Sequence, residues 1–199
     1  MLRSLFCAVL LAGWALVSGP AQAKVHQVDD GGFVIRLSAT VPASPEATWQ
    51  ELVTPAHWWN PEHSYSGDSS NFSLEQHPGG CFCEALPDSS AELAVPLGGV
   101  EHMRVLYIEK DRQLRMAGGL GPLQSEAVVG TLTIALKPDE AGTRILWEYV
   151  VGGYMRLKPA EIAPAVDQVL GGQLARLALN LGAGIETSDP VPVDPAQGR

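Results

Sequence analysis

The segment over residues 159–181 is the feature that most constrains how this chain can fold. Its apolar residues recur at steps of three and four, which is the spacing of one helical face; they are Ile162, Val166, Val169, Leu170, Leu174, Leu177 and Leu181. Pro159 suits a first helical turn, and Gly182 and Gly184 are stop signals after the last turn. Since few polar residues interrupt the segment, the helix must lie on a large apolar surface, for which the preceding strands are the candidate.

The residues before this helix predict a sheet of about six or seven strands. Residues 33–41 alternate apolar and polar side chains, as a half-buried strand does. Ser44-Pro45 and Thr54-Pro55 are helix-start signals, so two short helices follow this first strand. Short apolar runs bounded by Gly, Pro and Asp predict the other strands, over residues 72–76, 81–86, 101–109, 113–117, 127–136 and 143–151. Residues 24–30 are interpreted as a lead-in, and residues 87–99 as a long loop.

Tight turns between consecutive strands favour an antiparallel meander with the long helix on one face, which gives an α+β fold. A curved sheet wrapped around a helix leaves room for a cavity between the two layers. The candidate ligand-binding residues are the aromatic and apolar side chains expected near that space: Trp49, Trp58, Trp59, Met116, Trp147, Tyr149, Val166 and Leu170.

The first 23 residues are interpreted as a secretory signal peptide. Arg3 is a basic start, residues 5–17 are an apolar run, and Ala21-Gln22-Ala23 is a small-residue cleavage site. The apolar run is too short for a stable membrane anchor. We therefore expect a periplasmic or secreted protein that is cleaved near Ala23.

The remaining chain is long enough for one domain with a sizeable core. We place this domain at residues 24–184. Residues 185–199 are rich in Pro and Asp and are expected to be a disordered tail.

The charge balance argues against two classes of partner. The chain has 13 basic and 22 acidic residues, a net charge of −9, and loss of Arg3 with the signal peptide lowers it to −10. There is no dense Lys/Arg cluster, so binding to nucleic-acid phosphates or to anionic lipid headgroups is disfavoured. We expect no nucleic-acid partner and no integral membrane span, and the sequence identifies no protein partner.

Several short motifs follow one another along the chain in a distinctive order and spacing. One is Gly79-Gly80-Cys81-Phe82-Cys83-Glu84, and the others lie at residues 41–49, 58–59, 130–133, 143–145, 166–170 and 173–177. Together they resemble the START-like or SRPBCC superfamily with its helix-grip fold. Within it, the chain looks most like the branch of polyketide cyclases and the activator domain of the heat-shock-protein-90 ATPase, and residues 79–84 are similar to that branch's Gly-Gly-x-Phe-x-Glu strand start.

The resemblance covers about residues 33–181 and implies a cavity for a hydrophobic ligand rather than one activity. Members bind lipids, sterols or plant products, cyclise polyketides, or act as co-chaperones. They share no catalytic set, so no catalytic residue is carried over, and a fold does not define a function.

Cys81 and Cys83 are the most unusual pair, because alternation along a strand puts both thiols on the same face. Three interpretations stay open: a disulfide, two unpaired thiols, or a metal or redox site with His77, His57 or His63 as further ligands.

Three residues are candidates for acid–base catalysis: Glu84, His102 and His57. A carboxylate buried in the cavity would have a raised pKa and could transfer protons. The alternative is structural pairing, for example of Glu84 or Glu101 with Arg104 or Arg144. His57 and His63 flank Trp58-Trp59, either as a pocket mouth or as solvent-exposed neighbours of a buried Trp.

Motifs for common cofactors and nucleophiles are missing from the sequence. There is no phosphate-binding Gly-x-x-x-x-Gly-Lys-Ser/Thr and no Gly-x-Ser-x-Gly. The glycine-rich run over residues 118–121 opens no helix and is interpreted as a tight loop over the cavity. We expect no cofactor.

Three hypotheses for the function follow. The first is an exported, non-catalytic domain that binds a small hydrophobic ligand, lipid or polyketide-like, between the sheet and the last helix. The second is a cyclase or hydratase that uses the cavity His and Glu residues. The third is a metal or redox site at the Cys-x-Cys strand.

Overall fold

A computed structural model describes residues 25–88 and 96–183. Within them, eight strands form one antiparallel sheet in the order β1-β2-β8-β7-β6-β5-β4-β3. The strands are β1 (Val25–Asp29), β2 (Gly32–Val41), β3 (Phe72–Leu74), β4 (Cys81–Pro87), β5 (Pro96–Glu109), β6 (Gln113–Ala117), β7 (Ala127–Asp139) and β8 (Gly142–Tyr154). Short helices α1 (Pro45–Leu52) and α2 (Pro55–Trp58) follow β2, and α3 (Pro159–Asn180) ends the fold. The 3-10 turns are η1 (Pro61–His63), η2 (Ser69–Asn71) and η3 (Gly121–Ser125).

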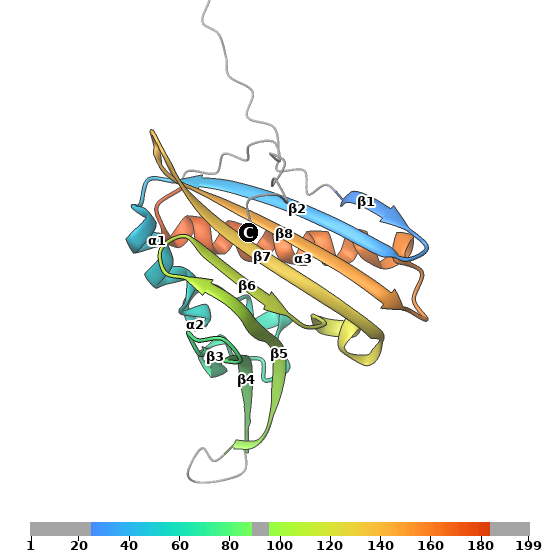
Figure 1. Ribbon diagram of the computed structural model, residues 1–199. Coiled ribbons are helices and arrows are strands. Elements are labelled where there is room, and N and C mark those ends of the chain that lie inside the picture. Colours follow the sequence, from blue (N-terminus) through green and yellow to red (C-terminus); the bar gives the residue numbers. More distant parts are fainter. Residues whose placement is uncertain (1–24, 89–95, 184–199) are drawn as a thin grey trace, which may run out of the picture.

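Helix α3 lies along one face of the curved sheet, behind β2 and β8 in Figure 1. This arrangement confirms the predicted α+β class and the helix-grip form. The buried side of α3 includes Ala163, Val166, Leu170, Leu174 and Leu177. Four of these belong to the apolar face expected from the sequence, and the other expected residues, Ile162, Val169 and Leu181, are half-buried. Among the described residues, no helix is long and apolar enough to cross a membrane.

The sheet has one strand more than the upper end of the predicted range. Residues 25–29 form β1, which pairs with β2, where a lead-in was predicted. Most of β1 is exposed, so it lacks the buried half of the alternating pattern. The turn into β2 requires glycine, because a Cβ at Gly32 would clash with the carbonyl oxygen of Val151.

Strand β5 also begins earlier than predicted, at Pro96 instead of residue 101. Residues 96–99 pair with the end of β4 and therefore do not belong to a loop. Residues 89–95, the rest of the predicted loop, lie outside the described residues. The predicted signal peptide (residues 1–23) and C-terminal tail (residues 185–199) also lie outside them.

An irregularity in β5 decides the orientation of one site residue. Phe82 pairs with Met103 and Cys83 with Glu101, so His102 is the extra residue of a β-bulge. Both His102 and Met103 are buried, which breaks the alternation of the strand. The bulge therefore turns His102 toward the interior.

Candidate functional site

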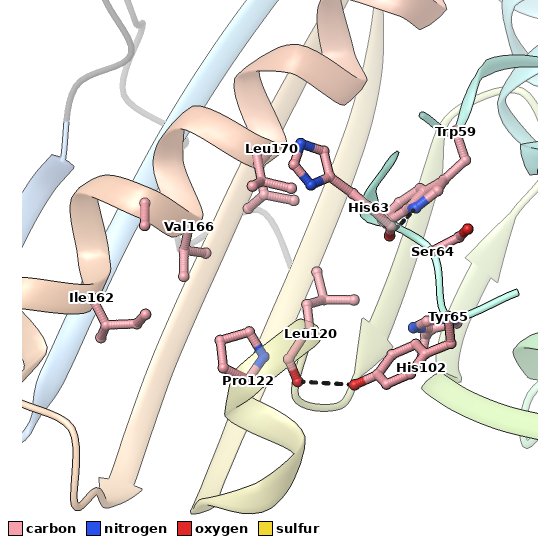
Figure 2. A pocket seen from close by; sticks show the side chains of 13 residues that line it. Trp59, His63, Ser64, Tyr65, His102, Leu120, Pro122, Ile162, Val166 and Leu170 are labelled. Atoms are coloured by element: carbon pink, nitrogen blue, oxygen red, sulfur yellow. Dashed lines mark hydrogen bonds between the residues drawn. The ribbon is translucent and has the colours of Figure 1, made fainter. Parts of the chain in front are cut away.

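A cavity of about 350 Å³ lies between α3 and the loops at one end of the sheet (Figure 2). Its walls come from three parts of the chain and from His102 of β5. The lining residues are Trp59, His63, Ser64, Tyr65, His102, Leu120, Gly121, Pro122, Ile162, Ala165, Val166, Val169 and Leu170. Most of this surface is apolar, and none of these side chains belongs to Lys, Arg, Asp or Glu.

The wall that carries Trp59, His63 and Tyr65 is tied to α3. The backbone N–H of Asn60 donates to Oε1 of Gln173 at 2.8 Å. Nε of Arg176 donates to the carbonyl of Trp58 at 2.9 Å. The polar residues of α3 therefore hold the α2–η1 segment beside the cavity while its apolar residues line it.

Tyr149 of β8 positions the wall that carries Leu120. Its buried hydroxyl donates to the carbonyl of Gly118 at 3.0 Å and accepts from the backbone N–H of Leu120 at 3.3 Å. Burial raises the pKa of Tyr149 well above its ordinary value, so the hydroxyl keeps its proton. Gly130 of β7 leaves room for the ring, because a Cβ there would overlap the phenol.

Glu84 and His102 form a buried hydrogen-bonded pair next to the cavity. Nε2 of His102 lies 2.9 Å from Oε2 of Glu84, and their side chains are 3% and 0% exposed. Oε2 also accepts from the backbone N–H of Tyr65 at 3.1 Å, and Oε1 accepts from that of Ser66. The carboxylate thus joins β4, β5 and the segment that lines the cavity mouth.

Opposing effects set the protonation of this pair. Burial raises the pKa of Glu84, but hydrogen bonds from Ser66, Tyr65 and His102 outweigh it and bring the pKa below the ordinary value. Burial lowers the pKa of His102 below its ordinary value, against the pull of Glu84. At neutral pH the carboxylate is therefore ionised and the imidazole is neutral.

Aromatic rings surround His102 and fix its plane. The Phe72 ring stacks on it at 5.0 Å with an interplanar angle of 15°. The rings of Phe82, Tyr65 and Trp59 lie at 5.4, 5.9 and 6.3 Å. The imidazole is thus held by packing on its faces and by Glu84 at one nitrogen.

The structure brings two of the three catalytic candidates together. Glu84 and His102 meet across the β4–β5 pair, and His102 lines the cavity. His57 lies on α2 with its side chain 59% exposed, 3.2 Å from Glu51, and it does not line the cavity. Of the suggested arginine pairings, that of Glu101 with Arg104 is confirmed, whereas Glu84 pairs with His102.

Three of the eight ligand-binding candidates line the cavity, namely Trp59, Val166 and Leu170. The other five are buried elsewhere in the core: Trp49, Trp58, Met116, Trp147 and Tyr149. Trp58 packs edge-on against Trp147 at 5.9 Å, and its indole N–H donates to the carbonyl of Glu51. These rings fill the space between the short helices and the sheet and so limit the cavity to one end.

The candidate list missed several lining residues. Ile162 and Val169 belong to the apolar face of the predicted helix. Leu120, Gly121 and Pro122 form the glycine-rich loop expected over the cavity, and His63 belongs to the expected pocket mouth. Ser64, Tyr65 and Ala165 gave no signal, because a polar loop residue or a lone Ala has no distinctive pattern in sequence.

Cys81 and Cys83 form a disulfide, which was one of the three interpretations of this pair. Both are half-buried, whereas Phe82 and Glu84 between and after them are buried on the other face of β4. In residues 25–88 and 96–183, no group of three or more His, Cys, Asp or Glu side chains could hold a metal ion. His77 is exposed and lies near Glu75 and Pro78.

Helix α3 carries a second buried carboxylate, Asp167, which is 3% exposed. Its Oδ1 has no hydrogen-bond partner among the described residues. Burial raises the pKa of Asp167 from 3.8 to about 6. Asp167 does not line the cavity.

Comparison with known proteins supports the fold but identifies no function. The chain matches no protein-family model and no curated protein sequence. Solved structures with the same fold include an uncharacterized protein of Rhizobium leguminosarum, at 17% identity and a TM-score of 0.52 over 74% of this chain and 93% of that one. Another is protein MLL2253 of Mesorhizobium loti, at 16% identity and a TM-score of 0.51 over 73% and 94%. A third is protein Ms6760 of Mycobacterium smegmatis, at 14% identity and a TM-score of 0.51 over 81% and 99%.

Proposed function

We propose that this protein binds a small hydrophobic molecule, lipid or polyketide-like, in the cavity between α3 and the loops at one end of the sheet, without changing it chemically. The observation that carries the proposal is the cavity itself. Its volume of about 350 Å³ and its apolar lining with a few polar edges match the usual form of a small-molecule site.

We also assign the domain to the START-like superfamily, in the branch of polyketide cyclases and heat-shock-protein-90 ATPase activators, as an exported member. The two short helices after a long strand, the antiparallel strands and the C-terminal helix support this assignment. The Cys81–Cys83 disulfide suits an oxidising compartment such as the periplasm.

Filling the cavity from α3 tests the binding. We expect the uncharged dye N-phenyl-1-naphthylamine to fluoresce on binding the wild-type protein. Ala165→Trp should weaken this binding by at least about tenfold, since the indole would occupy ligand volume. Ala175 is also exposed on α3 but lies outside the cavity lining, so Ala175→Trp is the matched control. Equal dye affinity in both variants would contradict the proposal.

A cyclase or hydratase activity is the second candidate, because the Glu84–His102 pair is an acid–base pair beside the cavity. Mass spectrometry of the co-purified molecule distinguishes the two. An unchanged mass after incubation with the protein supports binding alone. A gain or loss of water that His102→Phe prevents would instead support catalysis.

A further inference from the structure

Three nitrogen neighbours lie within hydrogen-bond distance of the Glu84 carboxylate. Two of these neighbours are the backbone N–H groups of Tyr65 and Ser66, and the third is Nε2 of His102. An ionised carboxylate only accepts hydrogen bonds. Nε2 of His102 must therefore carry a proton and donate it to Glu84.

The protonation state of Nδ1 follows from that of Nε2. A neutral imidazole has one N–H, so proton placement at Nε2 leaves Nδ1 as a bare acceptor. Among the described residues, Nδ1 of His102 has no hydrogen-bond partner, and the ring forms part of the cavity wall. Since Nε2 is occupied by Glu84, Nδ1 is the polar atom that His102 offers to a ligand.

Charge restricts the ligand further. The lining has no Lys or Arg to balance an anionic head group. The carboxylate of Glu84 lies directly behind the imidazole and repels a second negative charge at short range. A buried anion without a partner is costly.

We propose that Glu84 fixes the tautomer of His102 so that the cavity selects uncharged apolar ligands with one O–H or N–H donor, such as alcohols and phenols, over hydrocarbons and carboxylates. This inference rests on the proposed binding function and names the ligand chemistry of the same site. Glu84 is a positioning residue in this scheme, and His102 makes the contact.

Three probes of one ring system test the selection by displacing N-phenyl-1-naphthylamine at about pH 8, where ordinary imidazoles are neutral. 1-Naphthol carries a donor, 1-methylnaphthalene has no polar group, and 1-naphthoate is an anion. One net hydrogen bond should make naphthol bind about tenfold more tightly than methylnaphthalene. Naphthoate should bind most weakly.

Two variants change the preference in different ways. His102→Phe keeps an aromatic ring and removes the acceptor, so naphthol and methylnaphthalene should bind equally. In Glu84→Gln, the amide N–H₂ faces the backbone N–H of either Tyr65 or Ser66 in both of its orientations, so the side chain no longer fixes one tautomer of His102. The preference of that variant for naphthol over methylnaphthalene should therefore shrink, and 1-acetonaphthone, which offers a carbonyl acceptor, should bind more tightly than it does to the wild type. Glu101→Gln removes an exposed carboxylate on the same sheet and should leave the preference unchanged.

Nitrogen-15 NMR of the free protein reads the tautomer without any ligand. We expect a protonated Nε2 and a bare Nδ1 in the wild type. A protonated Nδ1 would overturn the inference even if Glu84→Gln failed to fold. If the dye binds but naphthol is no tighter than methylnaphthalene, the inference fails and the binding function survives. If no uncharged probe binds, the binding function itself is wrong.

Discussion

Glu84 and Asp167 are both buried carboxylate residues, and their surroundings differ. Glu84, on the sheet side of the cavity, accepts three hydrogen bonds, and its pKa lies below the ordinary value. Asp167, on α3, has a buried oxygen without a partner, and its pKa is raised to about 6. Burial alone does not make a carboxylate useful or costly; the donors around it do. Nothing in the structure explains why Asp167 is not apolar.

The largest expected effect comes from removing the satisfied carboxylate. Glu84→Leu leaves the backbone N–H groups of Tyr65 and Ser66 and the imidazole of His102 buried without an acceptor. We expect the free energy of unfolding to fall by roughly 3 kcal/mol or more. Urea denaturation measures it, with the exposed Glu101→Leu as control. A loss as small as that of the control would mean that the Glu84 contacts contribute little.

Replacing the unsatisfied carboxylate of Asp167 should have the opposite effect on the free energy of unfolding. Asp167→Asn removes a charge that burial disfavours, so the free energy of unfolding should rise by roughly 1–3 kcal/mol at about pH 8. The same urea experiment applies. Glu140→Gln, in the exposed turn between β7 and β8, is the control. Destabilisation by Asp167→Asn would show that Asp167 has a partner that satisfies its charge.

The gain in stability from Asp167→Asn should depend on pH, because proton binding to Asp167 is linked to folding. Unfolded Asp167 titrates near 3.8 and folded Asp167 near 6, so the folded state holds the proton in between. The contribution of Asp167 to the free energy of unfolding of the wild type therefore falls as the pH rises from about 4 to about 6 and is then constant. The gain from Asp167→Asn should be present at about pH 8 and absent at about pH 4.

His102 contributes in the other direction. Its pKa is lowered in the folded state, so its contribution to stability is present above the ordinary pKa of 6.5 and is lost as the pH falls. The pH-dependent contributions of Asp167 and His102 to stability partly cancel in the wild type. Asp167→Asn removes one of them, so its stability should fall more steeply on acidification than that of the wild type.

The smallest effect is expected at His57, which lies outside both carboxylate environments. Its contact with Glu51 is exposed, and such contacts contribute little. His57→Ala should change the free energy of unfolding by less than about 0.5 kcal/mol and leave dye binding unchanged. A loss of dye binding would place His57 in the site and weaken the assignment to His102.

The fold was largely predictable because its main elements have strong periodic patterns. The apolar face of α3, the alternation in β2 and β8 and the Ser44-Pro45 helix start are local signals. Strand β1 was missed because an exposed edge strand buries too little to show alternation.

The site was predictable only in part. Glu84 and His102 were both identified as candidates, but their pairing was not. They are 18 residues apart in the sequence. His102 faces inward because of a bulge in β5, and no residue type in this strand predicts that bulge. Five aromatic and apolar candidates that the sequence placed near the cavity are instead packed into the core.

By itself, the sequence determined which faces of α3 and of the strands are apolar, and hence the α+β architecture. Only the tertiary structure decided that the loops around Trp59–Tyr65 and Leu120–Pro122 leave a cavity beside α3, and that Glu84 meets His102 next to it. The physical reason is that periodicity reports which side of an element is buried. How closely two buried faces approach, and which polar atoms meet between them, depends on side chains from distant parts of the chain.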